Sequence, residues 1–471
     1  MSAADSVDSV GGARSGEAVV AAGRLRGEVG ADGLTVFRGI PYARADRFAA
    51  PEPVQPWTGV RDATRHGPIS PQPAVRPEAV MGPPQDGLVQ DEDCLNLTVI
   101  TPNRPDEPSA QRRPVLVWLH GGAYLTGASS FGFYDGRRLA AEGNVVFVGL
   151  NYRLGALGYL RAPGLSPGNL GLLDQLAALR WIRENIAAFG GDPDQVTVFG
   201  QSAGAHSLVC LLAMPATRGL FRRAILQSTP LGLKLATPAR ARKIAGHFTT
   251  ALDTDPRQAT TEEILAAQAS TIVRASGPGG LVAPPFCPTA ETEPLPDLRR
   301  WLVDATLPEV DVMIGVTRSE MNSFLNRNPA TAPIERIPIL GSRGLAAFKR
   351  AATRRVFASP SMKFANLLAT AGRKVFTYRF DWAASGSGYG ACHCIELPFL
   401  LGDREAWSRA PMLRGADWDA VDELGHSVRQ AWLSFARTGS AGSWPPHAPG
   451  AEAGRYWFEP AGLRAAPAGV V

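Results

Sequence analysis

A serine between small residues, at the junction of a strand and a helix, constrains this chain more than any other feature. Gly200-Gln201-Ser202-Ala203-Gly204 follows the β-branched run QVTVFG and precedes the apolar run AHSLVCLLAM. A turn this sharp needs small neighbours, strains the serine backbone and leaves its hydroxyl exposed. The following helix N-terminus offers unpaired N–H groups to a developing oxyanion. We therefore expect Ser202 to be a nucleophile and the Ala203 N–H to be an oxyanion donor.

A second copy of the same pattern does not meet these requirements. Gly164-Leu165-Ser166-Pro167-Gly168 has the same spacing, but no strand pattern precedes it. Pro167 also has no N–H that could serve as an oxyanion donor. We exclude Ser166 as a nucleophile for these reasons.

Six apolar runs predict the strands of a large sheet. Runs of this length with β-branched residues are typical of parallel strands buried on both faces. Apolar residues spaced three and four apart over 172–189 predict a helix between two of them. The order strand, helix, strand predicts an α/β fold with a mostly parallel central sheet and helices on both faces. The runs cover 114–120, 144–152, 195–200, 222–228, 310–317 and 374–381.

We expect one domain, 18–471, after a flexible lead-in at 1–17. The segment 60–92 is rich in Pro, Gly and Gln and predicts a long surface loop. Two further segments, 229–309 and about 321–372, fit the strand–helix rhythm poorly. We expect them to be helical excursions that form a cap over the site.

The oxyanion hole needs a second element. Strand 114–120 leads into His120-Gly121-Gly122-Ala123-Tyr124. Glycines after a buried strand let the backbone aim consecutive N–H groups into a cleft. Taken alone, this string reads as a simple glycine turn. Together with the serine turn it predicts Gly122 and Ala123 as oxyanion donors.

The general base should be a histidine that follows the serine, because after a serine turn between a strand and a helix the acid and then the histidine come later in the chain. His393 follows the Gly- and Ser-rich loop ASGSGYGAC, which leaves the strand 374–381. A loop at a strand end is where a base can reach the serine, so we select His393. The other four candidates lie on expected helices or in a Pro-rich tail: His206, His247, His426 and His447.

Two carboxylates are candidates for the acid that orients the base. Glu320 lies just beyond the strand 310–317, one predicted strand before the one that leads to His393. Asp381 ends the next strand and is the runner-up. We select Glu320 on its position and leave Asp381 open.

Composition argues against other classes of function. The 48 basic residues are spread beside 43 acidic ones, giving a net charge of +5 without a basic block, so we expect no nucleic-acid partner. No apolar run is long enough for a bilayer, and the start lacks a secretory pattern. The odd count of five cysteines favours reduced thiols in a cytoplasm. We expect no metal, since Cys392-His393-Cys394 lacks a second ligand cluster, and no cofactor.

Together these residues resemble the type B carboxylesterases, relatives of cholinesterases and bacterial p-nitrobenzyl esterases. The resemblance runs from FRGIPYA at 37–43 to FARTG at 435–439 and includes EDCLNL, WLHGGAYLTG, GVTRSE and HCIELPFLLG. It implies an α/β-hydrolase fold and places nucleophile, acid and base on Ser202, Glu320 and His393. It also implies that Ser228 supports these residues from behind.

The chain departs from the family pattern at three points. The family usually has Glu before the nucleophile, where this chain has Gln201, so we expect a changed response to cationic substrates. Ser70 stands where secreted relatives have a cysteine that pairs with the equivalent of Cys94. The stretch between Glu320 and His393 is short, which should trim the cap and reshape the pocket.

These observations predict a serine carboxylesterase that cleaves small-molecule esters through an acyl-enzyme on Ser202. Two alternatives stay open. The same residues could cleave amides or lactones, or transfer the acyl group to a specialised metabolite. A non-catalytic binding module is the more remote alternative, because fold alone does not establish function. The sequence leaves the oligomeric state open.

Overall fold

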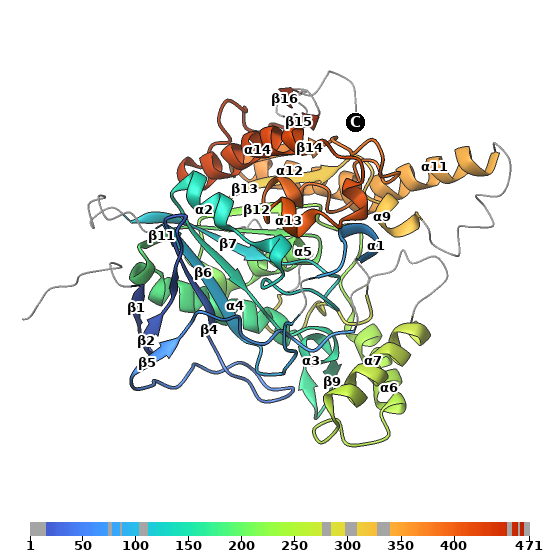
Figure 1. Cartoon of the computed structure of the whole chain (residues 1–471). Helices are drawn as coiled ribbons and strands as arrows, with labels where there is room; N and C mark the ends of the chain where they lie inside the picture. The colour runs from blue at the N-terminus through green and yellow to red at the C-terminus, as the bar shows by residue number, and fades with distance from the viewer. Residues whose placement is uncertain are drawn as a thin grey trace, which may run out of the picture.

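An eleven-stranded sheet forms the centre of the computed structural model (Figure 1). The structure describes residues 16–73, 78–84, 87–102, 112–275, 284–296, 309–326, 340–449, 455–459 and 462–465. The strand order is β16-β15-β14-β13-β12-β11-β7-β8-β6-β4-β3. The pairs from β8 through β15 are parallel, which confirms the mostly parallel sheet.

The described strands have the following bounds: β3 Glu28–Val29, β4 Leu34–Pro41, β6 Asn96–Pro102, β7 Arg113–Leu119, β8 Val146–Leu150, β11 Gly191–Gln201, β12 Arg223–Gln227, β13 Asp311–Thr317, β14 Val375–Phe380, β15 Arg455–Glu459 and β16 Gly462–Ala465. A separate three-stranded sheet contains β1 Glu17–Val20, β2 Gly23–Arg26 and β5 Val60–Asp62. A short antiparallel pair contains β9 Arg161–Ala162 and β10 Ser166–Pro167.

All six predicted strands are present, and burial on both faces explains their apolar runs. In β7, Val115, Val117 and Leu119 join the core on one face of the sheet. Leu116 and Trp118 join the core on the other face. Because side chains alternate along a strand, a strand buried on both sides needs apolar residues at successive positions.

Helices cover both faces of the sheet. One face carries α4 Leu170–Asn185, α5 Ala203–Ala213 and α12 Ser359–Thr370. The other face carries α2 Arg137–Gly143 and α14 Trp418–Thr438. The α/β-hydrolase fold predicted from the sequence is therefore confirmed.

The helix predicted over 172–189 is α4 followed by the 3-10 turn Ile186–Phe189. Its predicted apolar stripe is buried, with Leu172, Leu176 and Leu179 at most 4% exposed. The turn ends at Gly190, whose positive φ of 77° closes the helix. A left-handed glycine is the usual end of a helix.

The excursions contain helices, but not all of them stand apart from the sheet. Between β12 and β13 lie α6 Pro238–Ala251 and α7 Thr261–Ala275, which pack on each other. The second excursion contains α9 Asn322–Leu325, α11 Leu340–Thr353 and a π-helical turn, Arg354–Ala358. In Figure 1, α11 projects from the body of the molecule. The following helix, α12, packs on β13 and β14, because two parallel neighbours need a crossover that returns to the sheet.

The remaining short helices are α1 Glu78–Met81, α3 Gly155–Tyr159 and α13 Arg404–Trp407. The segment 60–92 is mostly loop in its described part, apart from β5 and α1. The predicted lead-in, 1–17, lies outside the described residues except for its last two, and Glu17 begins β1. Parts of both excursions, 276–283, 297–308 and 327–339, also lie outside the described residues.

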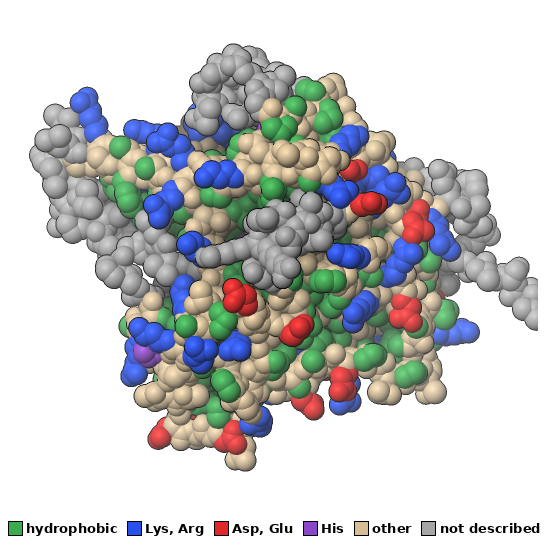
Figure 2. Space-filling view, turned by 180° about the vertical axis from the view of Figure 1, so that it is seen from behind, with side chains coloured by type: hydrophobic (Ala, Val, Ile, Leu, Met, Phe, Trp, Pro, Cys, Tyr) green, Lys and Arg blue, Asp and Glu red, His purple; other side chains and the backbone are tan. Residues whose placement is uncertain are grey.

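Within the described ranges, no helix is both long and apolar enough to cross a membrane. Figure 2 shows Lys and Arg side chains spread over one face of the molecule, with Asp and Glu side chains between them.

A buried ion pair ties the segment after β8 to helix α4. Arg153 is 4% exposed and Asp174 is fully buried. The two side chains form a two-pronged pair, with Nη2 to Oδ1 at 2.7 Å and Nε to Oδ2 at 2.9 Å. The Arg153 guanidinium also donates to the Ala49 carbonyl at 2.7 Å. One partner therefore cannot be removed without leaving the other charged and buried.

We predict that Asp174→Ala lowers the free energy of unfolding by about 3–5 kcal/mol, because it leaves the Arg153 charge uncompensated. Urea denaturation followed by circular dichroism measures this. The control is Asp194→Ala, which removes an exposed partner of Arg183 and should cost less than about 1 kcal/mol. Equal losses in the two variants would contradict the prediction.

Candidate active site

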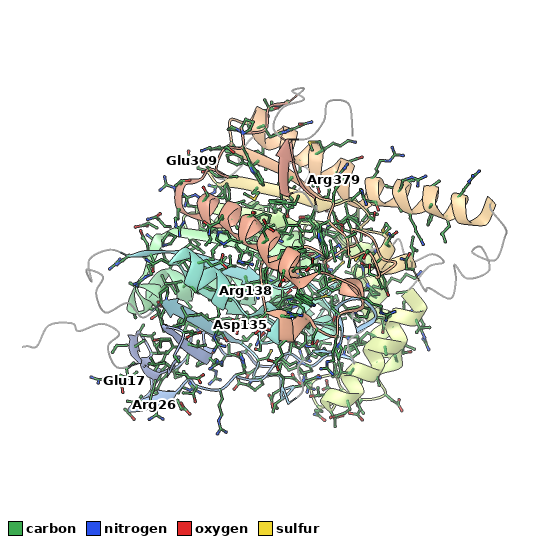
Figure 3. The ribbon with its side chains drawn as sticks, turned by 45° about the horizontal axis from the view of Figure 1, so that its top comes forward. Glu17, Arg26, Asp135, Arg138, Glu309 and Arg379 are labelled. Atoms are coloured by element: carbon green, nitrogen blue, oxygen red, sulfur yellow. The ribbon has the colours of Figure 1, made fainter. Side chains whose placement is uncertain are left out.

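The predicted site residues follow four strands that end at one edge of the sheet. The oxyanion loop follows β7, Ser202 follows β11, Glu320 follows β13 and His393 lies beyond β14. In Figure 3, Glu309 precedes β13 and Arg379 lies near the end of β14, so the two labels mark opposite ends of these parallel strands. The carboxyl edge of a parallel sheet is where α/β proteins build their sites.

Ser202 has the strained turn that the sequence predicts. Its φ is 56° and its ψ is −119°, a conformation that non-glycine residues rarely adopt. Its N–H donates to the Gln227 carbonyl on the neighbouring strand at 2.9 Å. A Cβ at Gly204 would lie 2.1 Å from the Leu119 carbonyl oxygen. The helix can therefore approach β7 only because Gly204 has no side chain.

The loop after β7 lies against the serine. A Cβ at Gly121 would lie 3.3 Å from the Ser202 Cβ. Gly122 and Ala123 both have positive φ, 117° and 55°. Within the described part of the chain, no hydrogen-bond acceptor pairs with the N–H of Gly122, Ala123 or Ala203. The structure thus leaves all three predicted donors available.

His120 holds this loop in place. Burial lowers its pKa to about 4, so the ring is neutral. Its Nδ1–H donates to the Gly121 carbonyl at 2.8 Å, and its ring stacks on Tyr152 with 4.4 Å between centroids. The Tyr152 hydroxyl donates to the His120 carbonyl at 2.7 Å. The loop backbone is therefore fixed before any substrate binds.

Glu320 and His393 are in direct contact. His393 Nδ1 lies 2.5 Å from Glu320 Oε2, and the Glu320 side chain is fully buried. The other carboxylate oxygen accepts from the Thr317 N–H at 2.7 Å. Ser323 Oγ donates to the His393 carbonyl at 3.0 Å. A carboxylate on Nδ1 leaves Nε2 as the free acceptor of the neutral ring.

The free nitrogen of His393 contacts Gln201 rather than Ser202. The Gln201 amide nitrogen lies 3.1 Å from His393 Nε2. Among the hydrogen bonds of the described residues, none joins the Ser202 hydroxyl to His393. The structure therefore brings the predicted acid and base into contact, and the predicted nucleophile, Ser202, directly follows the residue that contacts His393 Nε2.

Two neighbouring phenylalanine rings lie next to the imidazole. The Phe324 and Phe357 ring centroids lie 5.1 and 5.2 Å from that of His393. Phe324 comes from α9 and is 48% exposed, whereas Phe357 comes from the π-helical turn and is buried. The sequence analysis missed both, because helical spacing alone does not show which aromatic residues face the site.

The runner-up acid and the other histidines have different partners. Asp381 pairs with Arg379 through two contacts of 2.7 Å. His206 is buried beside the Tyr124 ring. His426 is exposed and contacts Glu142, and His447 contacts Asn366. No described contact joins any of these groups to His393.

A second buried carboxyl, that of Glu396, lies near Glu320 and was missed by the sequence analysis. Glu396 is fully buried, and the Tyr378 hydroxyl donates to its Oε2 at 2.9 Å. Burial and the nearby Glu320 carboxylate raise its pKa from 4.5 to about 8. Ser228, predicted to support the site from behind, lies beside Glu396 and is fully buried. The available signal was a glutamate in the otherwise apolar run IELPFLLG.

The described residues contain no group of three or more His, Cys, Asp or Glu that could hold a metal. Cys392 and Cys394 lie on either side of His393 and are free thiols whose pKa values are raised by burial.

The chain is similar to known proteins over most of its length. Residues 15–337 match the model of the "Carboxylesterase family". The chain is 45% identical to a "probable N-octanoylanthranilate hydrolase" of Rhodococcus erythropolis, over 91% of this chain and 94% of that protein. It is 35% identical to the "para-nitrobenzyl esterase" of Bacillus subtilis, over 90% and 91%. A solved thermophilic p-nitrobenzyl esterase superposes with a TM-score of 0.83 at 32% identity, covering 96% and 97% of the two chains.

The raised pKa of Glu396 predicts that this residue makes the folded state less stable as the pH rises. The folded state binds this proton more tightly than the unfolded state, so stability falls as pH rises from about 4.5 to about 8. Glu396→Gln stays neutral and should escape this loss. We expect its stability relative to the wild type to increase between pH 5 and 8.5, measured by urea denaturation. Glu184→Gln, at an exposed position on α4, is the control, and a parallel pH trend in both variants would sink the prediction.

Proposed function

This chain belongs to the carboxylesterase family, and from that premise we propose that Ser202, His393 and Glu320 are its nucleophile, base and acid. The chain is a serine hydrolase of carboxylic esters. The observation that carries the assignment is the 2.5 Å contact between His393 and buried Glu320, at the sheet edge where the Ser202 turn also lies.

The proposed reaction has two acyl-transfer steps. His393 Nε2 takes the Ser202 proton while Ser202 Oγ bonds to the ester carbonyl carbon. The N–H groups of Gly122, Ala123 and Ala203 donate to the oxyanion, and they need no reorganisation because they have no other partner among the described residues. The imidazolium then protonates the leaving alcohol. In the second step His393 takes a proton from water, which attacks the acyl-enzyme carbonyl, and the carboxylic acid product leaves as Ser202 regains its proton.

Glu320 acts through the base. Its carboxylate accepts a hydrogen bond from the Nδ1–H, which fixes the tautomer and stabilises the imidazolium that forms. The Thr317 N–H on its second oxygen holds the carboxylate in place.

A second candidate reaction is the cleavage of N-acyl aryl amides. The relative at 45% identity is named a hydrolase of an octanoylated anthranilate, which is such an amide. The Phe324 and Phe357 rings next to His393 offer an apolar surface on which an aryl leaving group can pack. We propose that this chain accepts aryl esters and anilides with a medium-length acyl chain.

We also propose a reducing compartment such as the cytoplasm for this chain. All five cysteines are free thiols, and four of them are buried. Ser70, buried in this structure, supports the same location, because it stands where secreted relatives carry a pairing cysteine.

We predict that Ser202→Ala and His393→Ala each lower kcat/KM for p-nitrophenyl butyrate by at least about a thousandfold, because each removes one of the groups that act as a unit. Release of p-nitrophenol measures this. Ser408→Ala and His426→Ala, at exposed positions, are the matched controls and should keep wild-type rates. Full activity in Ser202→Ala would show that Ser202 is not the nucleophile.

We predict that Phe324→Ala raises KM for N-octanoylanthranilate and p-nitrophenyl octanoate about fivefold or more, because it removes about 1 kcal/mol of apolar contact. Phe348→Ala, whose parent side chain is 46% exposed on α11, is the control. Steady-state kinetics on acetate, butyrate and octanoate esters also give the acyl-length preference. Equal KM values in Phe324→Ala and wild type would show that Phe324 does not contact the substrate.

A further inference from the structure

The hydrogen bonds around His393 define which of its nitrogens carries a proton. Glu320 Oε2 lies 2.5 Å from Nδ1, and an ionised carboxylate can only accept. In the neutral ring the proton is therefore on Nδ1, and Nε2 presents a single lone pair. Only one donor can occupy that lone pair at a time.

Gln201 occupies this lone pair in the structure. Its amide nitrogen lies 3.1 Å from Nε2, so the amide N–H is the donor. Gln201 is the last residue of β11 and is 1% exposed, which fixes its backbone directly before Ser202. The amide oxygen points to the glycine loop, where a Cβ at Gly121 would lie 2.8 Å from it. The absence of a side chain at Gly121 leaves room for the amide.

We propose that Gln201 is a positioning residue for His393: its amide N–H donates to Nε2 of the imidazole in the resting enzyme and yields Nε2 to the Ser202 hydroxyl when substrate binds. This inference rests on the roles proposed for Ser202 and His393.

The exchange is balanced in protons. In the resting state the Gln201 N–H donates to Nε2, and the Ser202 hydroxyl keeps its proton. On substrate binding the O–H of Ser202 replaces the N–H as donor, and its proton then moves to Nε2 as the Oγ–carbon bond forms. Gln201 neither gains nor loses a proton at any step.

The absence of charge on Gln201 matters because other titratable groups crowd His393. Glu320 faces it from the end of β13, and Glu396, which accepts from the Tyr378 hydroxyl, lies close enough to Glu320 to be repelled by it. Cys392 and Cys394 flank it on its own segment, and both are neutral because burial raises their thiol pKa values. The Phe324 and Phe357 rings that complete the surroundings are uncharged. A carboxylate at position 201 would add a second anion beside the ring, where the Gln201 amide nitrogen now lies 3.1 Å from Nε2, and would favour the imidazolium, which cannot act as the base.

Two nearly isosteric substitutions separate the hydrogen bond from the charge. Gln201→Met removes the donor without adding charge, and Gln201→Glu replaces it with an anion. The measurement is the acidic limb of the pH–kcat/KM profile for p-nitrophenyl butyrate, from pH 4.5 to 9, with thermal melting to verify folding. We expect the midpoint to rise from wild type to Gln201→Met by about half a pH unit. In Gln201→Glu we expect a rise of at least about one unit, because a nearby anion favours the charged ring.

Each outcome is decisive. The predicted order supports the role of the amide as a donor to the neutral base. A single midpoint for all three proteins overturns it and leaves Gln201 as packing only. A midpoint in Gln201→Met below that of the wild type also overturns it, because the amide oxygen would then be the working partner of the imidazolium. If Gln201→Glu does not fold, the pH midpoint of Gln201→Met relative to wild type still tests the proposal. Loss of activity in the wild type itself would instead refute the proposed function.

Discussion

The parallel pairing of neighbouring strands is the constraint on which the site depends. Parallel strands end at the same edge, so segments distant in sequence reach one place without any long-range recognition between them. β7, β11, β12, β13 and β14 are neighbours in the sheet, and each contributes a backbone or a side chain at that edge. The glycines that follow β7 and β11 then let the two chain segments approach, which a Cβ at Gly204 would prevent.

Two buried glutamates, Glu320 and Glu396, differ in their hydrogen-bond partners. Glu320 accepts hydrogen bonds from the Thr317 backbone N–H and from the His393 ring. Glu396 accepts one hydrogen bond from a tyrosine, and its Oε1 has no partner among the described residues. Burial and repulsion from Glu320 therefore leave Glu396 with a proton at neutral pH.

Much of the fold could be predicted from the sequence, because periodicity and burial leave direct traces. The six apolar runs and the α4 stripe are examples. The antiparallel strands β4 and β6 were missed, although β6 is buried throughout, because its run NLTVITP ends at a proline and comes soon after a predicted loop. Motifs also led to Ser202 and to the loop with Gly122. Sequence position alone could not exclude Asp381 as the acid, because its pairing with Arg379 is seen only in the three-dimensional structure.

The contacts that the sequence could not supply are those between side chains from different elements. No spacing rule relates Gln201 to His393, and none relates Phe357 to either. These residues meet only because a strand end, a crossover and a loop converge, and such convergence is a property of the tertiary structure.

The same convergence has a consequence for how the molecule folds. The contact between Gln201 and His393 joins residues 192 apart, and that between Glu320 and His393 joins residues 73 apart. Contacts of such long sequence separation are slow to form, because the loop entropy must be lost before they contribute. A chain emerging from the ribosome therefore carries Ser202 long before it carries Glu320 and His393. The proposed nucleophile has both its proposed acid and its proposed base only once the last third of the molecule is being added.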